Sequence, residues 1–341
     1  MIICIAEDRP SFEPSIRLLL LSLAEHSGDL PIYLFLPSAS QEFVAWLRRD
    51  PRITLCTDRL EGASKYNVKP QAMLQLMQKG YDDILWIDSD IIVAQSITAA
   101  LAGCSRDTIV VTEEALWSPH DDNDAWRARK WGFNVGRVLP FALNTAVVRV
   151  TRSHEQLLQR WQDLLQSDEY CRAQTLDWHD RPPHLISDQD ALTALLSSDF
   201  AHVPLKTLIR GRDIVQYFGP YGFTVHERIS MLLGRTPIFI HSQGPQKPWD
   251  RAWESSAELN LKDYLNDVYL DLSPYTLAAI KYRTNLPNDT SWMDAHYILS
   301  KVLRALALWR ISLVGLPIAI LADAYRLAKR TAPTPTRSSP T

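Results

Sequence analysis

Two aspartates separated by one residue, Asp88 and Asp90, directly follow the apolar residues 84–87. Three more apolar residues follow them, and an apolar run of this kind has the pattern of a buried strand with two carboxylates at its end. Side chains two residues apart on a strand point the same way, and an unpaired buried charge is costly. The carboxylates are therefore expected to share a cation, and hard divalent ions take carboxylates together with substrate phosphates. The pattern favours a metal–diphosphate site, although Asp-x-Asp also arises by chance in solvated turns.

Several residues far from this motif have types that suit the same site. His241 follows the apolar residues 238–240 and would offer a neutral imidazole. Gly244 would let the backbone approach a ligand closely, and Lys247 supplies a point charge suited to phosphate. Lys69, which precedes a proline at a helix start, is a second candidate for phosphate. A lone histidine is more often structural, and a lysine is more often solvated, so each has a structural alternative.

The elements that must position these residues alternate between strand and helix. Apolar runs predict strands at 2–6, 32–36, 53–56, directly before Asp88, and at 109–112, 139–149 and 238–240. Helical spacing predicts helices at 13–27, 39–49, 69–79, 153–167 and after Ser187, a suitable N-cap. This alternation indicates an α/β fold with a largely parallel sheet and helices on both faces. Ligands bind such sheets at the carboxyl ends of strands, so Asp8 and the Asp88–Asp90 pair are expected to share one crevice.

Bulk properties set limits on the class of protein. A chain of 341 residues suffices for one large domain or two small ones, and its net charge of −3 argues against a nucleic-acid-binding surface. The four cysteines are far apart, which predicts reduced thiols and neither a disulfide framework nor a zinc site. The amino terminus lacks the pattern of a signal peptide. We therefore expect a protein of the reducing cytoplasm.

Two segments each have two open interpretations. The polar residues 113–137 are either a solvated loop or a loop that binds an acceptor and closes as a lid. Residues 302–330 are rich in Leu, Ala, Ile and Arg, but their most apolar run, 311–322, is shorter than the ~20 residues that span a bilayer. Aromatic and basic flanks favour peripheral contact with an anionic membrane through 300–330, and the alternative is a helix packed on the rest of the protein.

The motifs, taken together and in order, resemble those of retaining glycosyltransferases of the GT-A fold. The chain is similar to glycosyltransferase family 8, the group of glycogenin and the bacterial lipopolysaccharide galactosyl- and glucosyltransferases. The resemblance covers residues 1 to about 255 and rests on Ala6-Glu7-Asp8, Lys69-Pro70, Asp88-Ser89-Asp90, Asn144-Thr145-Ala146, Asp188-Gln189-Asp190 and His241 to Trp249. The family more commonly has Ala at the position of Ser89, and a Ser/Ala-Gly pair where this chain has Thr145-Ala146.

The resemblance implies a fold and a set of site residues. The fold would be a GT-A Rossmann-like mixed sheet flanked by helices at 1–255. For the rest of the chain, composition predicts a helical extension at 256–330, which either contacts a membrane or packs on this domain, and a disordered tail at 331–341. Mn²⁺ or Mg²⁺ would bind to Asp88, Asp90 and His241. The donor would contact Ala6, Asp8, Lys69, Ser89, Asn144, Gly244 and Lys247, with Asp8 at the base. Catalytic residues around the transferred sugar would be Asp188, Gln189 and Asp190.

The function that the resemblance implies is metal-dependent transfer of a hexose with retention of anomeric configuration. The donor would be a nucleotide-diphosphate sugar, most simply UDP-linked, and the acceptor a glycan or a lipid-linked molecule of the cell envelope. A cation suits this chemistry because the leaving diphosphate gains negative charge as the anomeric bond breaks. The protein would work in the cytoplasm, alone or on the inner face of the cytoplasmic membrane, with no nucleic-acid partner. Two alternatives are a non-catalytic nucleotide-sugar-binding protein and a haloacid-dehalogenase-like phosphotransferase.

Overall fold

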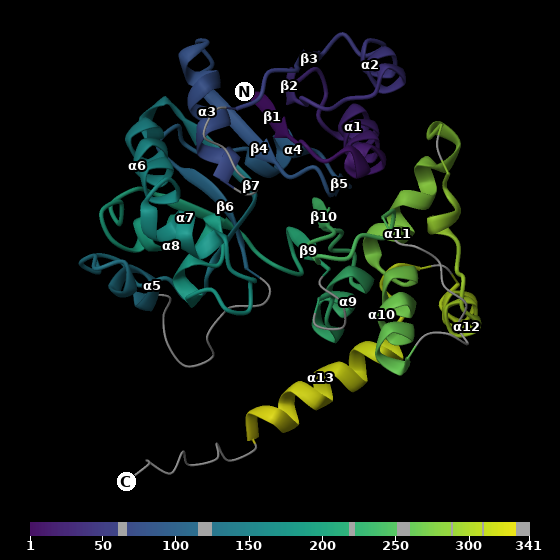
Figure 1. The fold of residues 1–341 in the computed structure, drawn as a ribbon. Helices are drawn as coiled ribbons and strands as arrows, with labels where there is room; N and C mark the ends of the chain where they lie inside the picture. Colours follow the sequence, from purple (N-terminus) through teal and green to yellow (C-terminus); the bar gives the residue numbers. More distant parts are fainter. Residues whose placement is uncertain are drawn as a thin grey trace.

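A seven-stranded sheet forms the centre of the molecule (Figure 1), which the computed structural model describes at residues 1–60, 67–114, 125–217, 222–250, 260–287, 289–308 and 310–331. The strand order is β3-β2-β1-β4-β7-β6-β8. The strands are β1 (Ile2–Ala6), β2 (Ile32–Phe35), β3 (Ile53–Cys56), β4 (Asp83–Ile87), β6 (Ile109–Glu113), β7 (Leu143–Thr151) and β8 (Leu205–Leu208). The strand β7 runs antiparallel to both neighbours, whereas the other pairs are parallel. The sheet is therefore mixed, and the predicted α/β fold class is confirmed.

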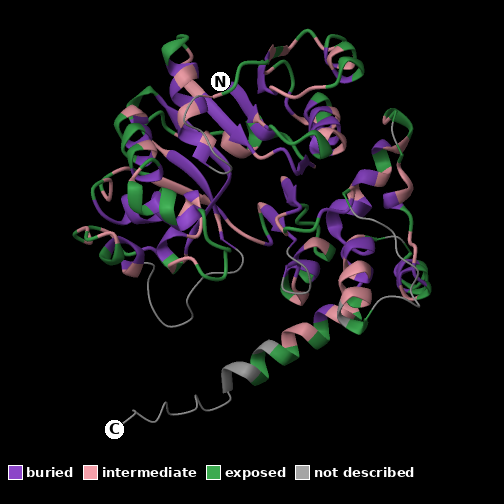
Figure 2. Cartoon of the chain, viewed as in Figure 1, coloured by how far each residue is buried: buried purple, intermediate pink, exposed green. Residues whose placement is uncertain are grey.

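Helices cover both faces of this sheet because side chains alternate along each strand. On β1, Ile2 and Cys4 belong to one apolar cluster, and Ile3 and Ile5 to another. The first cluster includes α3 (Val68–Gln78), α6 (Glu155–Leu165), α7 (Asp168–Gln174) and α8 (Asp188–Ser197). The second includes α1 (Glu13–His26), α2 (Gln41–Leu47) and α4 (Ile97–Leu101). The buried strands between these layers form the continuous core seen in Figure 2.

A second sheet changes the interpretation of residues 84–93. Its strands are β5 (Ile91–Val93), β10 (Phe239–His241) and β9 (Ile214–Gln216), with β10 in the middle. As predicted, the two carboxylates follow the end of a strand: the chain leaves the large sheet after β4, turns at 88–90 and then enters the small sheet as β5. Asp88 and Asp90 therefore lie in a turn between two sheets. Alternation along a strand does not bring them together.

One of the carboxyl-terminal helices packs directly on the small sheet, and the others surround it. These helices are α9 (Val225–Leu232), α10 (Leu261–Asp271), α11 (Pro274–Ala279), α12 (Ile298–Leu306) and α13 (Leu316–Thr331). Tyr275 and Ala279 of α11 share an apolar cluster with Ile92 of β5 and Ile240 of β10. The predicted boundary near residue 255 lies outside the described residues, as does the tail at 332–341, so the predicted domain limits stay predictions.

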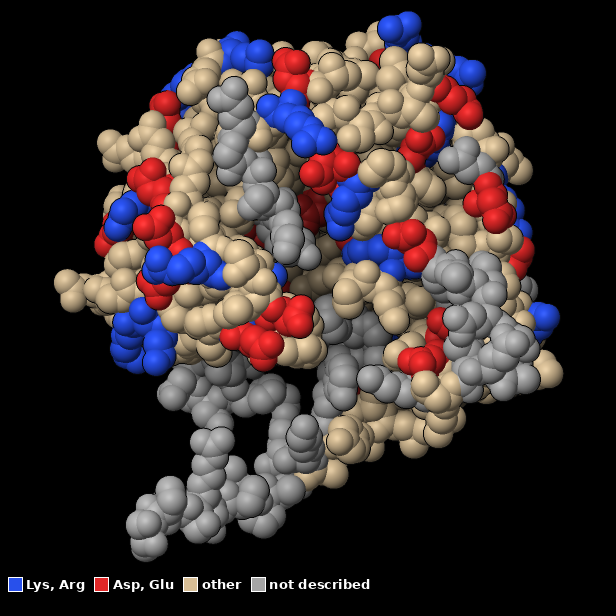
Figure 3. All heavy atoms as spheres, viewed as in Figure 1, with Lys and Arg blue, Asp and Glu red and all other residues tan. Residues whose placement is uncertain are grey.

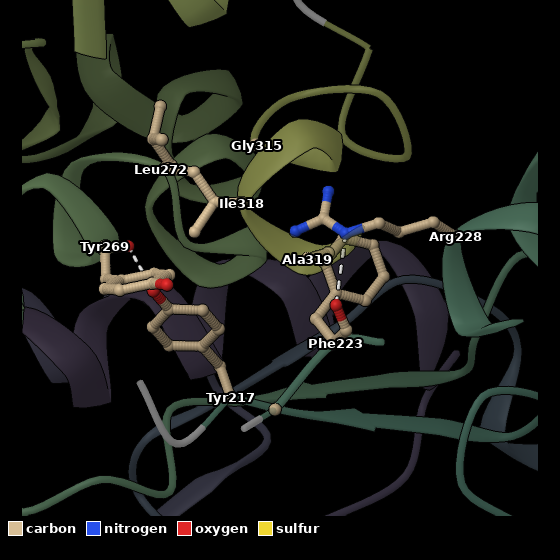
Figure 4. A pocket seen from close by; sticks show the side chains of 9 residues that line it. Tyr217, Phe223, Arg228, Tyr269, Leu272, Gly315, Ile318 and Ala319 are labelled. Carbon is tan, nitrogen blue, oxygen red and sulfur yellow. Dashed lines mark hydrogen bonds between the residues drawn. The ribbon is translucent and has the colours of Figure 1, made fainter. Parts of the chain in front are cut away.

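The helix α13 also contacts α9. The carboxylate of Asp323 accepts a hydrogen bond from the backbone N–H of Val225, at 3.0 Å. Arg228 is buried here, stacks on Phe223 and donates to backbone carbonyls in the segment before α13. A pocket lies at this contact (Figure 4), and none of the predicted site residues lines it. Over the part of the chain that the structure describes, no helix combines the length and the apolar character needed to cross a membrane.

Candidate active site

Strand register brings Asp88, Asp90 and His241 together. The backbone N–H of Asp88 bonds to the carbonyl of Ala146 on β7, at 2.8 Å. Antiparallel pairing of β5 with β10 sets His241 opposite Ile91, and the N–H of Ser242 bonds to the carbonyl of Asp90, at 3.0 Å. Ligand atoms of the three side chains lie within 4.8 Å of one another. The geometry thus agrees with the predicted metal site, although the three residues come from a turn and a second sheet.

The carboxylate of Asp90 lies between an ammonium group and an imidazole ring. It accepts a hydrogen bond from Nζ of Lys247 at 2.6 Å, and its other oxygen is 3.3 Å from Nε2 of His241. Burial alone would raise the pKa of Asp90, but Lys247 and His241 outweigh it and hold that pKa well below its usual range. Asp90 is therefore ionised despite being buried.

Asp88 has a different environment. Its carboxylate accepts from the indole N–H of Trp86 at 2.7 Å and from Nζ of Lys69 at 3.2 Å. Burial raises the pKa of Asp88, and Lys69 offsets only part of that effect. Additional positive charge beside Asp88 would therefore stabilise the ionised form.

The side chains present fit a divalent cation. Two carboxylates and an imidazole suit Mn²⁺ or Mg²⁺ when substrate oxygens complete the coordination. Nδ1 of His241 is buried and has no hydrogen-bond partner among the described residues. An unpaired buried polar atom is costly, so this nitrogen is free either to coordinate an ion or to bond to a bound ligand.

Lys69 lies beneath the same carboxylates. It is in the first turn of α3, and its Nζ donates to the carbonyl and the hydroxyl of Thr145 at 3.1 and 2.9 Å. The carboxylate of Asp188 is 3.5 Å away. Burial disfavours its charge, but the carboxylates of Asp188 and Asp88 more than compensate and raise the pKa of Lys69. A permanent positive charge therefore links α3, β7 and α8 at the site.

The predicted sugar-contacting residues form one polar network, which includes a residue that the sequence analysis did not select. The buried carboxylate of Glu114, directly after β6, accepts from Nδ2 of Asn144 at 2.8 Å and from Nε2 of Gln189 at 2.7 Å. Nδ2 of Asn144 also donates to Oε1 of Gln189, at 3.1 Å. Nε2 of Gln243 reaches the same carboxylate at 2.9 Å. The two predicted amides are thus held together by an unpredicted acid.

The two aspartates that flank Gln189 have different surroundings. Asp188 accepts from the hydroxyl of Thr145 at 2.8 Å and faces Lys69. Asp190 pairs with Arg127 at 2.7 Å and accepts from the backbone N–H of Ser187, which closes the capping box at the start of α8. These contacts give Asp190 a structural task, and its predicted catalytic role is not tested.

At the end of β1, a buried acid stands beside the predicted base-contacting residue. Glu7 accepts from the hydroxyl of Ser89 at 2.6 Å and pairs with Arg9 at 2.7 Å. Asp8 is exposed next to it, and Ala6 is half-buried in the last strand position. β1 and β4 are parallel neighbours, so their carboxyl ends share an edge, as predicted.

Four residues of this site were missed as individuals: Glu7, Glu114, Thr145 and Gln243. Glu7 and Glu114 each stand directly after a strand, which was a signal that the sequence analysis used only for Asp8 and Asp88. Gly244 lies where predicted, and its N–H bonds to the carbonyl of Tyr217 at 3.2 Å. The polar segment 113–137 includes Glu114, the acid of this network, and α5 (Ala125–Lys130), while residues 115–124 lie outside the described chain. Figure 3 shows a hollow near the middle of one face, with acidic and basic side chains gathered around it.

The chain is similar to solved structures of glycosyltransferases. The WbbM bifunctional glycosyltransferase aligns with a TM-score of 0.49 and 14% identity over 82% of this chain and 51% of its own. The galactosyltransferase LgtC, solved with donor and acceptor sugar analogues, gives 0.48 and 13% over 84% of this chain and 100% of its own. GlyE of Streptococcus pneumoniae TIGR4 gives 0.44 and 16% over 83% of this chain and 63% of its own.

These structures belong to the class that the sequence motifs indicate. The chain spans about half the length of WbbM. No protein-family model matches the sequence, and no curated protein matches it either. TM-scores below 0.5 do not decide an activity, which must come from the chemistry of the cleft.

Proposed function

We propose that this protein is a metal-dependent glycosyltransferase that moves a hexose from a nucleotide-diphosphate sugar, UDP-linked in the simplest case, to a hydroxyl of a glycan or lipid-linked acceptor. The observation that carries the proposal is the convergence of Asp88, Asp90 and His241 beside two buried lysines. The two carboxylates and the imidazole suit a divalent ion, and the two ammonium groups suit a diphosphate. The set as a whole therefore suits a diphosphate that is bound together with a metal ion.

The site residues have two proposed roles, metal binding and diphosphate binding. Asp88, Asp90 and His241 would hold Mn²⁺ or Mg²⁺, which supplies positive charge where the leaving diphosphate becomes more negative. Lys69 and Lys247 would neutralise diphosphate oxygens, and because both are already fixed by buried partners they need little reorganisation when the bond breaks. The leaving group then needs no strong general acid, in contrast to glycoside hydrolysis.

The sugar would lie against Asn144, Asp188 and Gln189. Gln189 is a weak nucleophile, and Asp188 is engaged by Thr145 and Lys69. We propose retention of anomeric configuration from the family resemblance, and proton NMR of the first product formed would reveal the anomer. An inverted product would remove the retaining part of the proposal and leave the transfer itself intact.

The deciding experiment is release of nucleoside diphosphate from a panel of nucleotide sugars. Wild type with Mn²⁺ or Mg²⁺ is expected to release it from one or two of them, and EDTA is expected to abolish the release. Asp88→Asn keeps the size of the side chain and removes one ligand charge, so release should fall at least a hundredfold. Asp83→Asn at the start of β4 is a matched control, because Asp83 pairs with Arg149 outside the cleft residues.

Other outcomes separate the alternatives. Metal-dependent UDP binding without release, in the presence of acceptor panels, would favour the nucleotide-sugar-binding protein. Phosphate release from a phosphomonoester, lost in Asp88→Asn, would favour the phosphotransferase. Absence of both binding and release would contradict the proposed function.

We also propose that the acceptor is presented at a membrane surface. Exposed large apolar side chains concentrate on α9, α10, α12 and α13 and directly after α9 and α12 (Figure 2), and among the described residues only Val138, Leu176 and Trp178 lie elsewhere. Ile298, Val302 and Leu306 recur every fourth residue along α12, so they form one apolar stripe. Peripheral binding to an anionic bilayer would cover this stripe, with the exposed Lys301 and Arg310 close in sequence.

A further inference from the structure

The carboxylate of Glu114 is the point at which three side-chain amides meet. It accepts from Asn144 of β7 at 2.8 Å, from Gln189 of α8 at 2.7 Å, and from Gln243, after β10, at 2.9 and 3.1 Å. Glu114 is 1% exposed, so water does not compete for these bonds. One acid at the end of β6 therefore joins β7, α8 and the segment after β10, and so links the two sheets.

An ionised carboxylate only accepts hydrogen bonds, so each amide must turn its NH₂ group toward Glu114. The amide oxygens consequently point elsewhere, and two of them have partners. Oδ1 of Asn144 accepts from the N–H of Ala146 at 2.8 Å, and Oε1 of Gln189 accepts from Asn144. The orientation of these two amides is thus fixed at both ends.

The third amide oxygen has no partner within the described part of the chain. Oε1 of Gln243 is buried and makes no hydrogen bond with any described residue. The Nε2 atom of the same amide bonds to Glu114, which also holds Gln189, so this oxygen lies beside the network of predicted sugar-contacting residues. A buried carbonyl oxygen held in this way is prepared to accept a hydrogen bond from a ligand.

We propose that Gln243 is a specificity-determining residue whose Oε1 accepts a hydrogen bond from a sugar hydroxyl, and that Glu114 is the positioning residue that aims it. This inference rests on the proposed function. A hydroxyl suits the oxygen because it donates, whereas an ionised phosphate does not. The hydroxyl belongs either to the transferred hexose or to the acceptor, because both must meet near Gln189. A site that bonds to a hydroxyl in this way discriminates against a sugar that lacks or misplaces it.

The test uses two variants and one matched control. Gln243→Leu keeps the size of the side chain and removes the acceptor oxygen. Glu114→Gln is isosteric but can offer only one accepting oxygen to three amides. Glu113→Gln is the same change one residue earlier, where the carboxylate accepts from the backbone N–H of Arg210 and from none of the three amides. Melting temperatures confirm that each variant folds.

Binding is measured by calorimetry with Mn²⁺, first with UDP alone and then with UDP-glucose, UDP-galactose and UDP-N-acetylglucosamine. In a second arm, the KM for acceptor is measured with the simple methyl glycoside that wild type uses fastest. All proteins are expected to bind UDP within twofold of wild type, because no proposed diphosphate contact changes. If the hydroxyl belongs to the donor, the ratio of the affinities for the preferred UDP-sugar and for the other two falls about tenfold in both variants. If it belongs to the acceptor, that preference is kept and the acceptor KM rises about tenfold.

A merely structural role for Glu114 would lower UDP affinity and melting temperature together, without a selective loss in either sugar arm. In the double variant Glu114→Gln with Gln243→Glu, the carboxylate moves to the other partner, so most of the selective loss should be recovered. Unchanged sugar preference and unchanged acceptor KM in Gln243→Leu would overturn the inference and leave the proposed function standing. Failure of wild type to bind UDP or any UDP-sugar would overturn both.

Discussion

Lys247 decides the charge balance at Asp90. The ammonium group lies 2.6 Å from a carboxylate that is 8% exposed, and His241 alone would remain if it were removed. Removal of one partner from a buried ion pair leaves the other charge buried and uncompensated. The stability lost in this way exceeds the net stability that the pair contributes. The stability of this part of the cleft therefore depends on a residue proposed to bind diphosphate.

Lys247→Met is expected to destabilise the protein by about 3–5 kcal/mol in EDTA. Mn²⁺ or Mg²⁺ should then raise the melting temperature of the variant more than that of wild type, because the ion meets a more negative site. Calorimetric melting with and without the ion measures both effects. Lys206→Met is the control, since its Nζ bonds to the backbone carbonyl of Ala100 at 2.9 Å. An equal metal response in Lys247→Met and wild type would show that Lys247 and the ion do not share Asp90.

Several site residues could be predicted because charged side chains are unusual directly beside the apolar run of a buried strand. Asp88 and Asp90 were visible as charges beside apolar runs, and the structure brings them to His241. Glu114 was not visible, since one acid in a polar segment looks the same whether solvated or buried. Only the packing of β6 against β7 and α8, which is a long-range property, brings its carboxylate within hydrogen-bond distance of Asn144 and Gln189.

At the scale of elements, the sequence predicted strands and helices well where the apolar periodicity is strong. It predicted them less well where packing against elements distant in the sequence determines the local structure. The cap at Ser187 and the helix after it were predicted, because a capping box is local. The change of sheet at 88–90 was not, because apolar residues on both sides satisfy two different sheets. The short α7, within a polar and Pro-containing stretch, is held by Tyr170 and Ala173 against the main core, which no local pattern reveals.

His154 illustrates how a junction between elements depends on pH. Its Nδ1 accepts from the N–H of Thr151 at the end of β7, and Nε2 lies 3.0 Å from the carbonyl of Asp107, so the ring must be neutral with its proton on Nε2. Burial lowers the pKa of His154. The unfolded chain therefore binds this proton more readily, and the stability contribution is complete above about pH 6.5 and lost as pH falls toward the folded pKa.

We expect His154→Gln to reduce the pH dependence of stability between pH 7.5 and pH 5. Urea unfolding at several pH values measures it, with His179→Gln at an exposed turn as the control. Wild type and the control should lose more stability than His154→Gln over this range. Parallel pH profiles for all three would contradict the assignment of a neutral ring to this junction.

Gly211, in the turn between β8 and β9, has a backbone conformation and an environment that exclude a side chain. Its φ is +76°, and a Cβ there would lie 2.5 Å from Cγ of Glu227. Glu227 cannot easily move, because its carboxylate pairs with Arg210 at 2.9 Å. Gly132, with φ +74° and nothing within 4 Å, has the same backbone conformation without the contact.

Gly132→Ala should therefore cost only the left-handed strain, about 1–2 kcal/mol. Gly211→Ala should cost that amount and the clash as well, so it is expected to be the more destabilised of the two. Chemical denaturation of the two variants beside wild type measures the difference. Equal losses of unfolding free energy would show that the Glu227 side chain moves away from the new Cβ without destabilising the protein.

At the scale of the whole molecule, the carboxyl-terminal helices both complete the fold and expose apolar surface. Arg304 of α12 is 1% exposed, and its guanidinium donates to the carbonyls of Met293, at 2.8 Å, and Asp271. Leu303 and Val314 are buried in the same cluster, whereas Leu306 and Leu321 are 77% and 71% exposed. Deleting residues 300–341 would therefore damage the core along with any membrane-binding surface, and point substitutions at exposed positions separate the two.

Leu306→Glu combined with Leu321→Glu should weaken binding to vesicles at least tenfold, because each change places a carboxylate where apolar contact and anionic lipid are expected. The measurement is co-sedimentation with phosphatidylcholine vesicles containing phosphatidylserine, beside Leu176→Glu, an exposed leucine next to α7. Melting temperatures should stay within a few degrees of wild type, since neither side chain is buried. Vesicle binding that the double variant retains in full would exclude this surface as the contact. A wild type that sediments as a dimer, without lipid binding, would show that a second copy of the chain covers it.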